Sequence, residues 1–401
     1  MGDKARITIN GHEVISWEDT YKKWYFIDDE KIYQVGDLYK NGTNEFIGYR
    51  SSVATIKRRL KIDGYDLRSA EIDFNETRSV WIKDIKKITD QFKNDIKSTD
   101  DVFKKHIIDK LTPVLELIKN TDFNQWFKAL SKKLSQSNDS AIFTSPLDKL
   151  MSGILYGVDI KNYGVARGLF PCSQVETYAV ILCELSNDED ICELDLKTII
   201  NDIKWIDFLD FDSVRSKHKT QNYIVFEESL SELIELNNND ANPLIKRMIF
   251  SSVIAAMEAF LSDTLKRSVL NRRAVQRRFV ENYASFDKNM KESQIFRFMD
   301  DLDKRIISEI DKMLFHNMSV VKEIYKNVLF CDLKEDLVSK IIRYVLTRHD
   351  IVHRNGKGVD GSVLLITMEE VSGLINAVNE FVRDIDKQII DGLLDARNDQ
   401  H

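Results

Sequence analysis

Apolar residues at helical spacing run through most of this 401-residue chain, and this pattern restricts its fold more than any other feature. They recur every three or four residues, which is the period of an amphipathic helix and not of a strand. The chain contains only four prolines, so long helices can continue without interruption. With 43% apolar residues it can bury the cores of two or three domains. We therefore predict a mainly α fold, α+β overall.

The first fifty residues differ, because apolar and polar residues alternate there more than anywhere later. Strands are predicted around 7–9, 13–15 and 23–27, with turns at 10–11 and 41–42. This pattern indicates a small strand-rich region near the N-terminus.

Helical patterns follow this region. Ser51 or Ser52 can cap a helix over 53–62, and a long charged helical pattern covers 67–120. Pro113 is expected to break that pattern or to begin a new helix.

The middle of the chain combines helical and strand signals. A helix is predicted around Trp126, a serine and a proline at 145–146 mark the start of another, and the apolar run 178–183 predicts a strand. The polar run 237–240 marks a boundary before further helices. We divide the chain into a mixed N-terminal domain at 1–120, a middle α/β segment at 121–240 and a C-terminal helical bundle at 241–401.

Composition narrows the classes of function. The net charge of −7 argues against a protein that coats nucleic acid through phosphate contacts alone. No apolar run approaches the ~20 residues of a membrane span, and the first residues lack a signal-peptide core, so we expect a cytoplasmic protein with no membrane partner. The four cysteines and seven histidines do not form a zinc-binding pattern, and no glycine-rich phosphate loop is present. We expect no metal and no cofactor.

The most informative local sequence is Arg-His-Asp-Ile-Val-His-Arg-Asn-Gly at 348–356, where a strongly apolar helix ends. At ~100° per residue, Arg348, His349 and His353 project from the apolar half of that helix, which predicts that they are buried. Burying such groups without partners costs several kcal/mol each. They should therefore face a paired cavity, a subunit boundary or a substrate.

The spacing Arg-x4-His followed by Asn-Gly resembles the active-site motif of the HEPN superfamily, whose members are mostly metal-independent ribonucleases of defence systems. The resemblance extends over roughly 245–395, with a first long helix around 252–261, the motif helix and a closing helix from Thr367. The N-terminal region, around 47–53 and 60–74, looks like the domain found ahead of HEPN or Toprim modules.

This resemblance implies a role for each motif residue. His353 would act as general acid or base, because an imidazole changes charge near neutral pH, and Arg348 would grip the scissile phosphate. His349 would bind phosphate or orient His353. With the ribose 2′-hydroxyl as nucleophile no metal is required, and the products are a 2′,3′-cyclic phosphate and a 5′-hydroxyl. Supporting roles are expected for Asp350, Glu258 and Asn355.

The spacing also bears on assembly. Arg348 and His353 are five residues apart, or ~140° around one helix, so they converge on one atom only if the helix frays or a second copy joins. We predict a homodimer through the HEPN bundle, with a higher oligomer or a co-encoded defence partner as alternatives.

A run of cations precedes the motif, with no acidic residue between Asp263 and Glu281. It can guide RNA toward the motif, while a solvated helix face explains it nearly as well. The predicted RNA-binding residues are Lys266, Arg267, Arg272, Arg273, Arg277 and Arg278.

The sequence thus favours an RNA endonuclease of toxin or antiphage type, whose N-terminal two-thirds senses a trigger, restrains the nuclease or shapes substrate access. The alternative is a catalytically silent HEPN module that serves oligomerisation or RNA binding in a larger defence complex. A third reading is an antitoxin or immunity partner.

Overall fold

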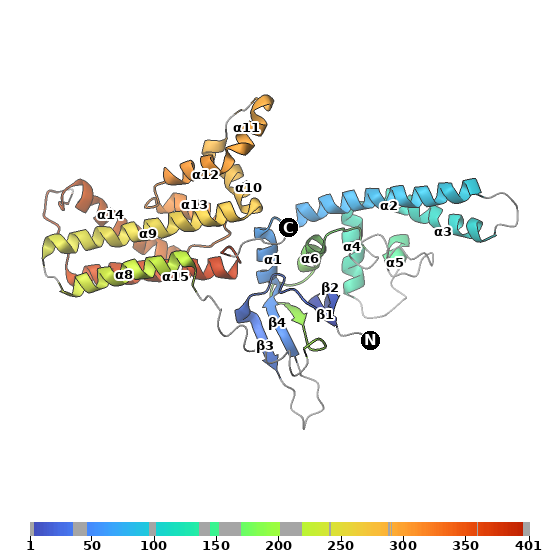
Figure 1. Ribbon diagram of the computed structural model, residues 1–401, viewed down its shortest axis with the longest axis horizontal. Helices are drawn as coiled ribbons and strands as arrows, with labels where there is room; N and C mark the ends of the chain where they lie inside the picture. The colour runs from blue at the N-terminus through green and yellow to red at the C-terminus, as the bar shows by residue number, and fades with distance from the viewer. Residues whose placement is uncertain are drawn as a thin grey trace, which may run out of the picture. The chain divides into compact units, whose positions relative to one another are not determined.

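The computed structural model describes residues 4–34, 46–95, 102–135, 145–151, 170–200, 219–239, 242–287, 289, 291–358 and 360–395. It is predominantly helical, with one small sheet built mainly from the N-terminal region, so the predicted fold class is confirmed (Figure 1). The chain divides into two compact units, 1–214 and 215–401.

The sheet of the first unit has five antiparallel strands in the order β2-β1-β5-β4-β3. Four come from the N-terminal region, and β5 arrives from much later in the chain to fill the centre. The strands are β1 (Lys4–Ile9), β2 (His12–Glu18), β3 (Lys31–Gln34), β4 (Phe46–Ser52) and β5 (Ile191–Asp195).

The predicted first hairpin is confirmed. Residues 7–9 and 13–15 lie in β1 and β2, and the turn between them has positive φ at Asn10 (+48°) and Gly11 (+76°), as tight hairpin turns require. The second predicted turn, at 41–42, lies outside the described residues.

The strand predicted at 23–27 is wrong, because this stretch forms a turn. Its alternating apolar residues instead anchor a loop: Tyr25 and Phe26 are buried, and the ring of Phe26 lies 6.1 Å from that of Tyr49 on β4. Alternation reports burial on one side, and a loop packed on a sheet satisfies it as well as a strand.

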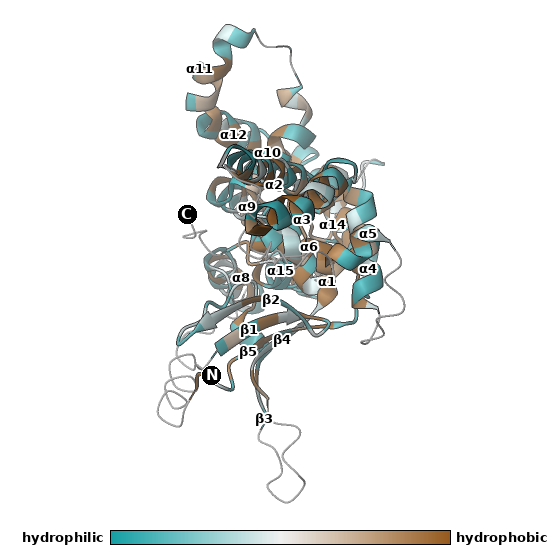
Figure 2. Cartoon of the chain, turned by 90° about the vertical axis from the view of Figure 1, so that its right-hand side faces the viewer, coloured by the Kyte–Doolittle hydropathy of each residue, from teal (hydrophilic) through white to brown (hydrophobic). Residues whose placement is uncertain are grey.

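Helices cover the rest of the first unit, and Figure 2 shows that many of them carry both polar and apolar residues around their circumference. Ser52 caps the first helix as predicted, its hydroxyl accepting from the Thr55 amide at 3.2 Å. Pro113 lies inside α3, so the predicted break is wrong; α3 packs against α2, and Leu111, Val114 and Leu115 around the proline are buried. These helices are α1 (Val53–Ile62), α2 (Leu67–Asp95), α3 (Val102–Lys119), α4 (Phe123–Leu134), α5 (Pro146–Met151) and α6 (Val175–Glu184).

The strand predicted at 178–183 is also wrong, since these residues lie in α6. Residues 179–183 are at most 2% exposed, and a helix buried on nearly all sides has the same continuous apolar run as a buried strand. Asp73, from α2, fixes the outcome by accepting hydrogen bonds from the amides of Ser173 and Gln174, each at 3.1 Å.

Asp73 is 5% exposed, and hydroxyls also donate to it, among them that of Thr177. Burial acts to raise the pKa of this carboxyl, but the hydrogen bonds from Ser173, Thr177 and Gln174 outweigh it and hold the pKa below its usual value. The carboxylate thus joins α2 to the N-terminus of α6.

The described part of the second unit consists of helices and loops with one isolated antiparallel bridge, Lys357 to Val363, and it is organised around α9, which packs on α8, α10, α12, α14 and α15. Asn242 caps α9, its side chain accepting from the Leu244 amide at 2.9 Å. The helices are α8 (Gln221–Asn239), α9 (Pro243–Asn271), α10 (Arg273–Asn282), α11 (Ile295–Asp300), α12 (Leu302–Asp311), α13 (Met318–Val328), α14 (Glu335–His353) and α15 (Met368–Asp391), with short 3-10 turns η4 (Ala284–Phe286) and η5 (Glu292–Gln294).

Candidate active site

The predicted motif lies at the C-terminal end of α14. The first half of this helix is anchored in the unit by Leu337, Val338 and Ile341, which are at most 4% exposed. The helix then ends in a left-handed turn at Asn355 (φ +53°) and Gly356 (φ +75°). The Gly356 amide donates to the carbonyls of Asp350 and Ile351 at 3.2 and 3.1 Å, which satisfies the carbonyls at the helix end.

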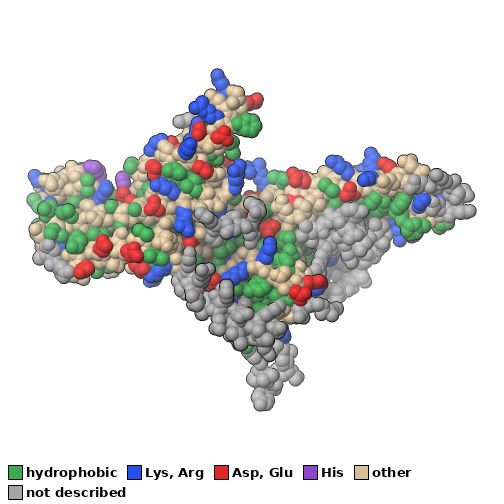
Figure 3. All heavy atoms as spheres, viewed as in Figure 1, with side chains coloured by type: hydrophobic (Ala, Val, Ile, Leu, Met, Phe, Trp, Pro, Cys, Tyr) green, Lys and Arg blue, Asp and Glu red, His purple; other side chains and the backbone are tan. Residues whose placement is uncertain are grey.

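The two histidines of the motif are exposed, so the prediction that they are buried is wrong for His349 and His353 within one chain. The second half of α14 has little packed on it, as the 63% exposure of Leu346 shows. The imidazole rings lie side by side with centroids 4.5 Å apart, and Figure 3 shows histidine side chains at the surface over α14.

Arg348 is half-buried, one turn before the end of the helix. Its Nε is shielded from solvent and has no hydrogen-bond partner among the described residues. A shielded guanidinium N–H without an acceptor is costly. An anion bound beside Arg348 would remove that cost.

The backbone of α14 stays helical through His353, so the fraying that would let Arg348 and His353 converge is not observed. In a regular helix the two side chains diverge by ~140°. One copy of the motif therefore presents its arginine and its final histidine in different directions.

The supporting residues are placed by local contacts. Asp350 forms an ion pair with Arg354, and the Asn355 carbonyl accepts a hydrogen bond from Nη1 of Arg247 at 3.3 Å. Oε1 of Glu258 instead lies 3.3 Å from Nδ1 of His316, without the geometry of a hydrogen bond. Glu258 lies eleven residues after Arg247 along α9, or ~16 Å, so it is not brought to the helix end.

Arg247 was not predicted from the sequence. It lies near the start of α9, more than one hundred residues before the motif, and no local pattern marks it. Only the antiparallel packing of α9 against α14 brings it to Asn355 and Gly356.

The predicted RNA-binding cations are mostly engaged within the unit. Arg273 is exposed, and Arg272 donates to the Leu393 carbonyl. Lys266 lies nineteen residues after Arg247 along α9, or ~28 Å, so the cluster begins far from the motif. The other contacts are Lys266 with Asp311, Arg267 with Asp395, Arg277 with Glu281, and Arg278 with the Val328 carbonyl and the Phe330 ring.

Several apolar side chains on the elements that carry or adjoin the motif are exposed. They lie on the second half of α14, on the loop and first residue that lead into α15, and on the first turns of α9, which the Arg247 contact holds next to the motif. The exposed residues are Leu244, Met248, Ile342, Leu346, Val352, Val363, Leu365 and Met368.

Within the described residues, no group of three or more histidine, cysteine or acidic side chains could hold a metal ion, and no helix has the length and apolarity that a membrane crossing requires. The four cysteines are all buried thiols.

Comparison with family models identifies the class of protein. The family model for HEPN/Toprim N-terminal domain 1 matches residues 1–222, and that for RiboL-PSP-HEPN matches residues 221–391. The chain is a HEPN-domain protein with an N-terminal HEPN/Toprim domain, as the motif and the N-terminal sequence around 47–53 and 60–74 had indicated. HEPN domains are typically ribonucleases or RNA-binding modules. Comparison with curated proteins and with solved structures gives no match.

Proposed function

We propose that this protein is a metal-independent RNA endonuclease of the toxin or antiphage-defence type. The observation that carries the proposal is the end of α14, where two exposed imidazoles 4.5 Å apart adjoin an arginine whose Nε has no acceptor among the described residues. Proton transfer and phosphate binding are the two tasks that cleavage through a 2′-hydroxyl requires.

In the proposed reaction, His353 takes the proton of the ribose 2′-hydroxyl as its oxygen attacks the adjacent phosphorus. The bond from phosphorus to the 5′-oxygen breaks as the new bond forms, and an imidazolium returns a proton to the leaving oxygen. Arg348 binds the non-bridging oxygens, and His349 binds phosphate or orients His353. The products are a 2′,3′-cyclic phosphate and a 5′-hydroxyl, so DNA is not cut.

The proposed site is completed by a second copy of the chain. Arg348 and His353 diverge on one helix, while eight apolar side chains around them are exposed, and a twofold mate on this surface would both cover these side chains and bring a second motif. Leu346→Glu should shift sedimentation toward the monomer, whereas Val225→Glu, at a 53% exposed position on α8, should not. A wild-type chain that is monomeric at micromolar concentration contradicts this arrangement.

The function is tested by incubating the purified chain with total cellular RNA in EDTA and mapping the cleaved ends. Wild type should leave cyclic phosphates, and Arg348→Ala and His353→Ala should each reduce cleavage by about 100-fold or more. Arg343→Ala, an exposed arginine on the same helix, is the matched control and should cleave normally.

Intact RNA in EDTA, and again with magnesium or manganese, would contradict the nuclease. Expression in cells adds a second readout, since the intact chain should arrest growth and His353→Ala should relieve the arrest. Harmless expression of both, together with intact RNA, would favour the catalytically silent HEPN module.

A further inference from the structure

We propose that a pocket between α10, η4, α11 and α12 of the second unit binds one nucleotide through its base and its phosphate. The pocket encloses about 580 Å³, within the ~300–1,000 Å³ typical of small-molecule sites. It lies toward the C-terminal end of α9, whereas the motif lies at the start of that helix, on the order of 30 Å away. The site is thus distinct from the proposed RNA-cleaving site and does not depend on it.

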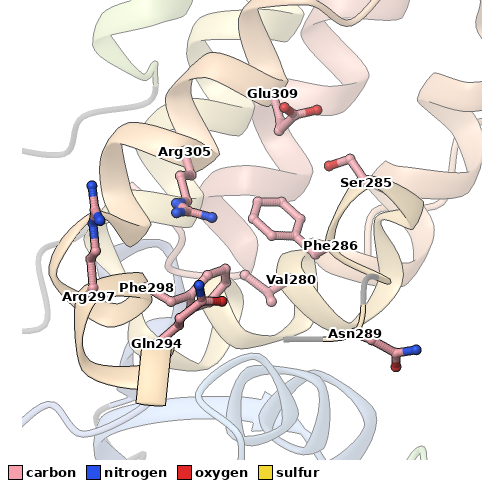
Figure 4. A pocket seen from close by; sticks show the side chains of 9 residues that line it. All are labelled: Val280, Ser285, Phe286, Asn289, Gln294, Arg297, Phe298, Arg305 and Glu309. Atoms are coloured by element: carbon pink, nitrogen blue, oxygen red, sulfur yellow. The ribbon is translucent and has the colours of Figure 1, made fainter. Parts of the chain in front are cut away.

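The wall of the pocket supplies surfaces on which a base can stack. Phe286 and Phe298 meet edge to face, with ring centroids 6.4 Å apart and planes at 87°. The guanidinium of Arg305 lies 5.0 Å from the centroid of Phe298, and Figure 4 shows both side chains beside the cavity. Unstacked bases bind to aromatic faces and to arginine planes of this kind.

Two cations beside this wall are available for an anion. Arg297 and Arg305 are exposed, and within the part of the chain that the structure describes neither forms an ion pair. This sets them apart from Lys266 and Arg267, which contact carboxylates. A guanidinium presents a planar fork that matches two phosphate oxygens, so a phosphate next to the stacked base would occupy both arginines.

The far side of the pocket can distinguish bases. The hydroxyl of Ser285 is shielded from solvent and has no hydrogen-bond partner among the described residues. Glu309 also lines the pocket, with its carboxylate held by Lys312 at 2.8 Å. A carboxylate accepts from the exocyclic amino group of adenine or cytosine, and uracil has no such donor. The site should therefore prefer AMP to UMP.

The experiment measures binding by titration calorimetry to the full chain carrying His353→Ala, which prevents cleavage of RNA probes. The probes are AMP, UMP, adenosine, inorganic phosphate and hexa-adenylate. AMP should bind at least about fivefold more tightly than UMP, adenosine or phosphate, and Arg305→Ala and Phe298→Ala should each weaken AMP at least about fivefold. Arg343→Ala, an exposed arginine on α14 outside the pocket lining, should change nothing.

The two possible sources of the nucleotide give different results. Tighter binding of AMP than of hexa-adenylate assigns the site to a free mononucleotide, and the reverse assigns it to an unstacked base of RNA. Arg305→Lys keeps the charge but loses the fork, so weakened binding by this variant with an unchanged circular dichroism spectrum supports direct contact.

Absence of binding by every probe at millimolar concentration would overturn the proposal, as would AMP binding that is unaffected by both Arg305→Ala and Phe298→Ala. The outcome is independent of the proposed function. If the wild-type protein does not cleave RNA but binds AMP, the nucleotide site is supported and the proposed nuclease function is contradicted. If it cleaves RNA but does not bind AMP, the nuclease function is supported and the nucleotide site is contradicted.

Discussion

Replacing Gly356 by alanine is expected to loosen the end of the motif helix, because this position combines two costs. Its φ of +75° is left-handed, which costs other residues about 1–2 kcal/mol. An added Cβ would lie 2.1 Å from Nη1 of Arg247, so that side chain must move and lose its 3.3 Å hydrogen bond to the Asn355 carbonyl. This bond is long and exposed, and its loss adds about 0.5 kcal/mol. The total of about 1.5–2.5 kcal/mol corresponds to a roughly 10- to 70-fold larger equilibrium constant for local opening, and so to faster amide exchange.

Hydrogen exchange read by mass spectrometry on peptides covering 350–364 measures this opening directly. Gly361→Ala is the matched control, because its φ is +82° but nothing lies within 4 Å of the added Cβ. Gly361→Ala should accelerate amide exchange around residue 361 only through the backbone strain of its positive φ. Combining Gly356→Ala with Arg247→Ala should remove the contact cost and leave the strain. Unchanged exchange in Gly356→Ala would refute the strain argument, and purely additive effects with Arg247→Ala would refute the contact argument.

Three further predictions concern stability. Asp73→Asn should destabilise the first unit by about 2–4 kcal/mol at neutral pH; because the native pKa of this carboxyl is lowered, its contribution is complete above the unfolded value of ~3.9 and is lost as the pH falls through the native one. Urea unfolding followed by tryptophan fluorescence, from five tryptophans that all precede residue 215, should show the difference from wild type shrinking in acid. Arg59→Met, measured in the same way, should lower the free energy of unfolding by about 3–5 kcal/mol, since it leaves Glu30 without the ion pair that Arg59 forms with it at 2.7 Å. A loss below about 1 kcal/mol would contradict a stabilising role for this pair. Tyr325→Phe should cost about 1–1.5 kcal/mol by removing the buried 2.7 Å bond to the Leu261 carbonyl, seen as earlier loss of helical circular dichroism; an unchanged transition would contradict it.

Features of the fold that depend on residues close together in the sequence could be predicted from the sequence. Ser52 and Thr367 each begin a helix as predicted, because a capping side chain acts on amides three residues away. Strand β5 and helix α6 could not be predicted. β5 forms by pairing with β1 and β4. The N-terminus of α6 is held by the Asp73 carboxylate of α2. All of these partners lie at least one hundred residues away in sequence.

The same distinction separates the features of the candidate site that could be predicted from those that could not. Sequence spacing located the motif residues on one helix and their divergence around it, since both follow from 3.6 residues per turn. The exposure of His349 and His353 was not predictable, because apolar periodicity marks a face that some partner covers without saying whether the partner is in the same chain. Arg247 was not predictable either, because its contact depends on how α9 packs against α14.

The mispredicted burial is itself informative about the site. The apolar half of α14 continues past Ile341, yet Ile342, Leu346 and Val352 remain 39–63% exposed. A helix end that only faces solvent ordinarily carries polar residues at its exposed positions. The apolar residues found here are instead typical of a surface that a partner covers. Arg348, whose Nε has no acceptor among the described residues, lies closest around the helix to Val352 and on the side away from Leu346. A partner that covers these apolar side chains would also exclude water from the arginine and the histidines, and in a drier site their interaction with phosphate is stronger. If the proposed dimer forms on this helix, assembly and cleavage are coupled, and Leu346→Glu, which should weaken the dimer, should also reduce RNA cleavage with both histidines intact.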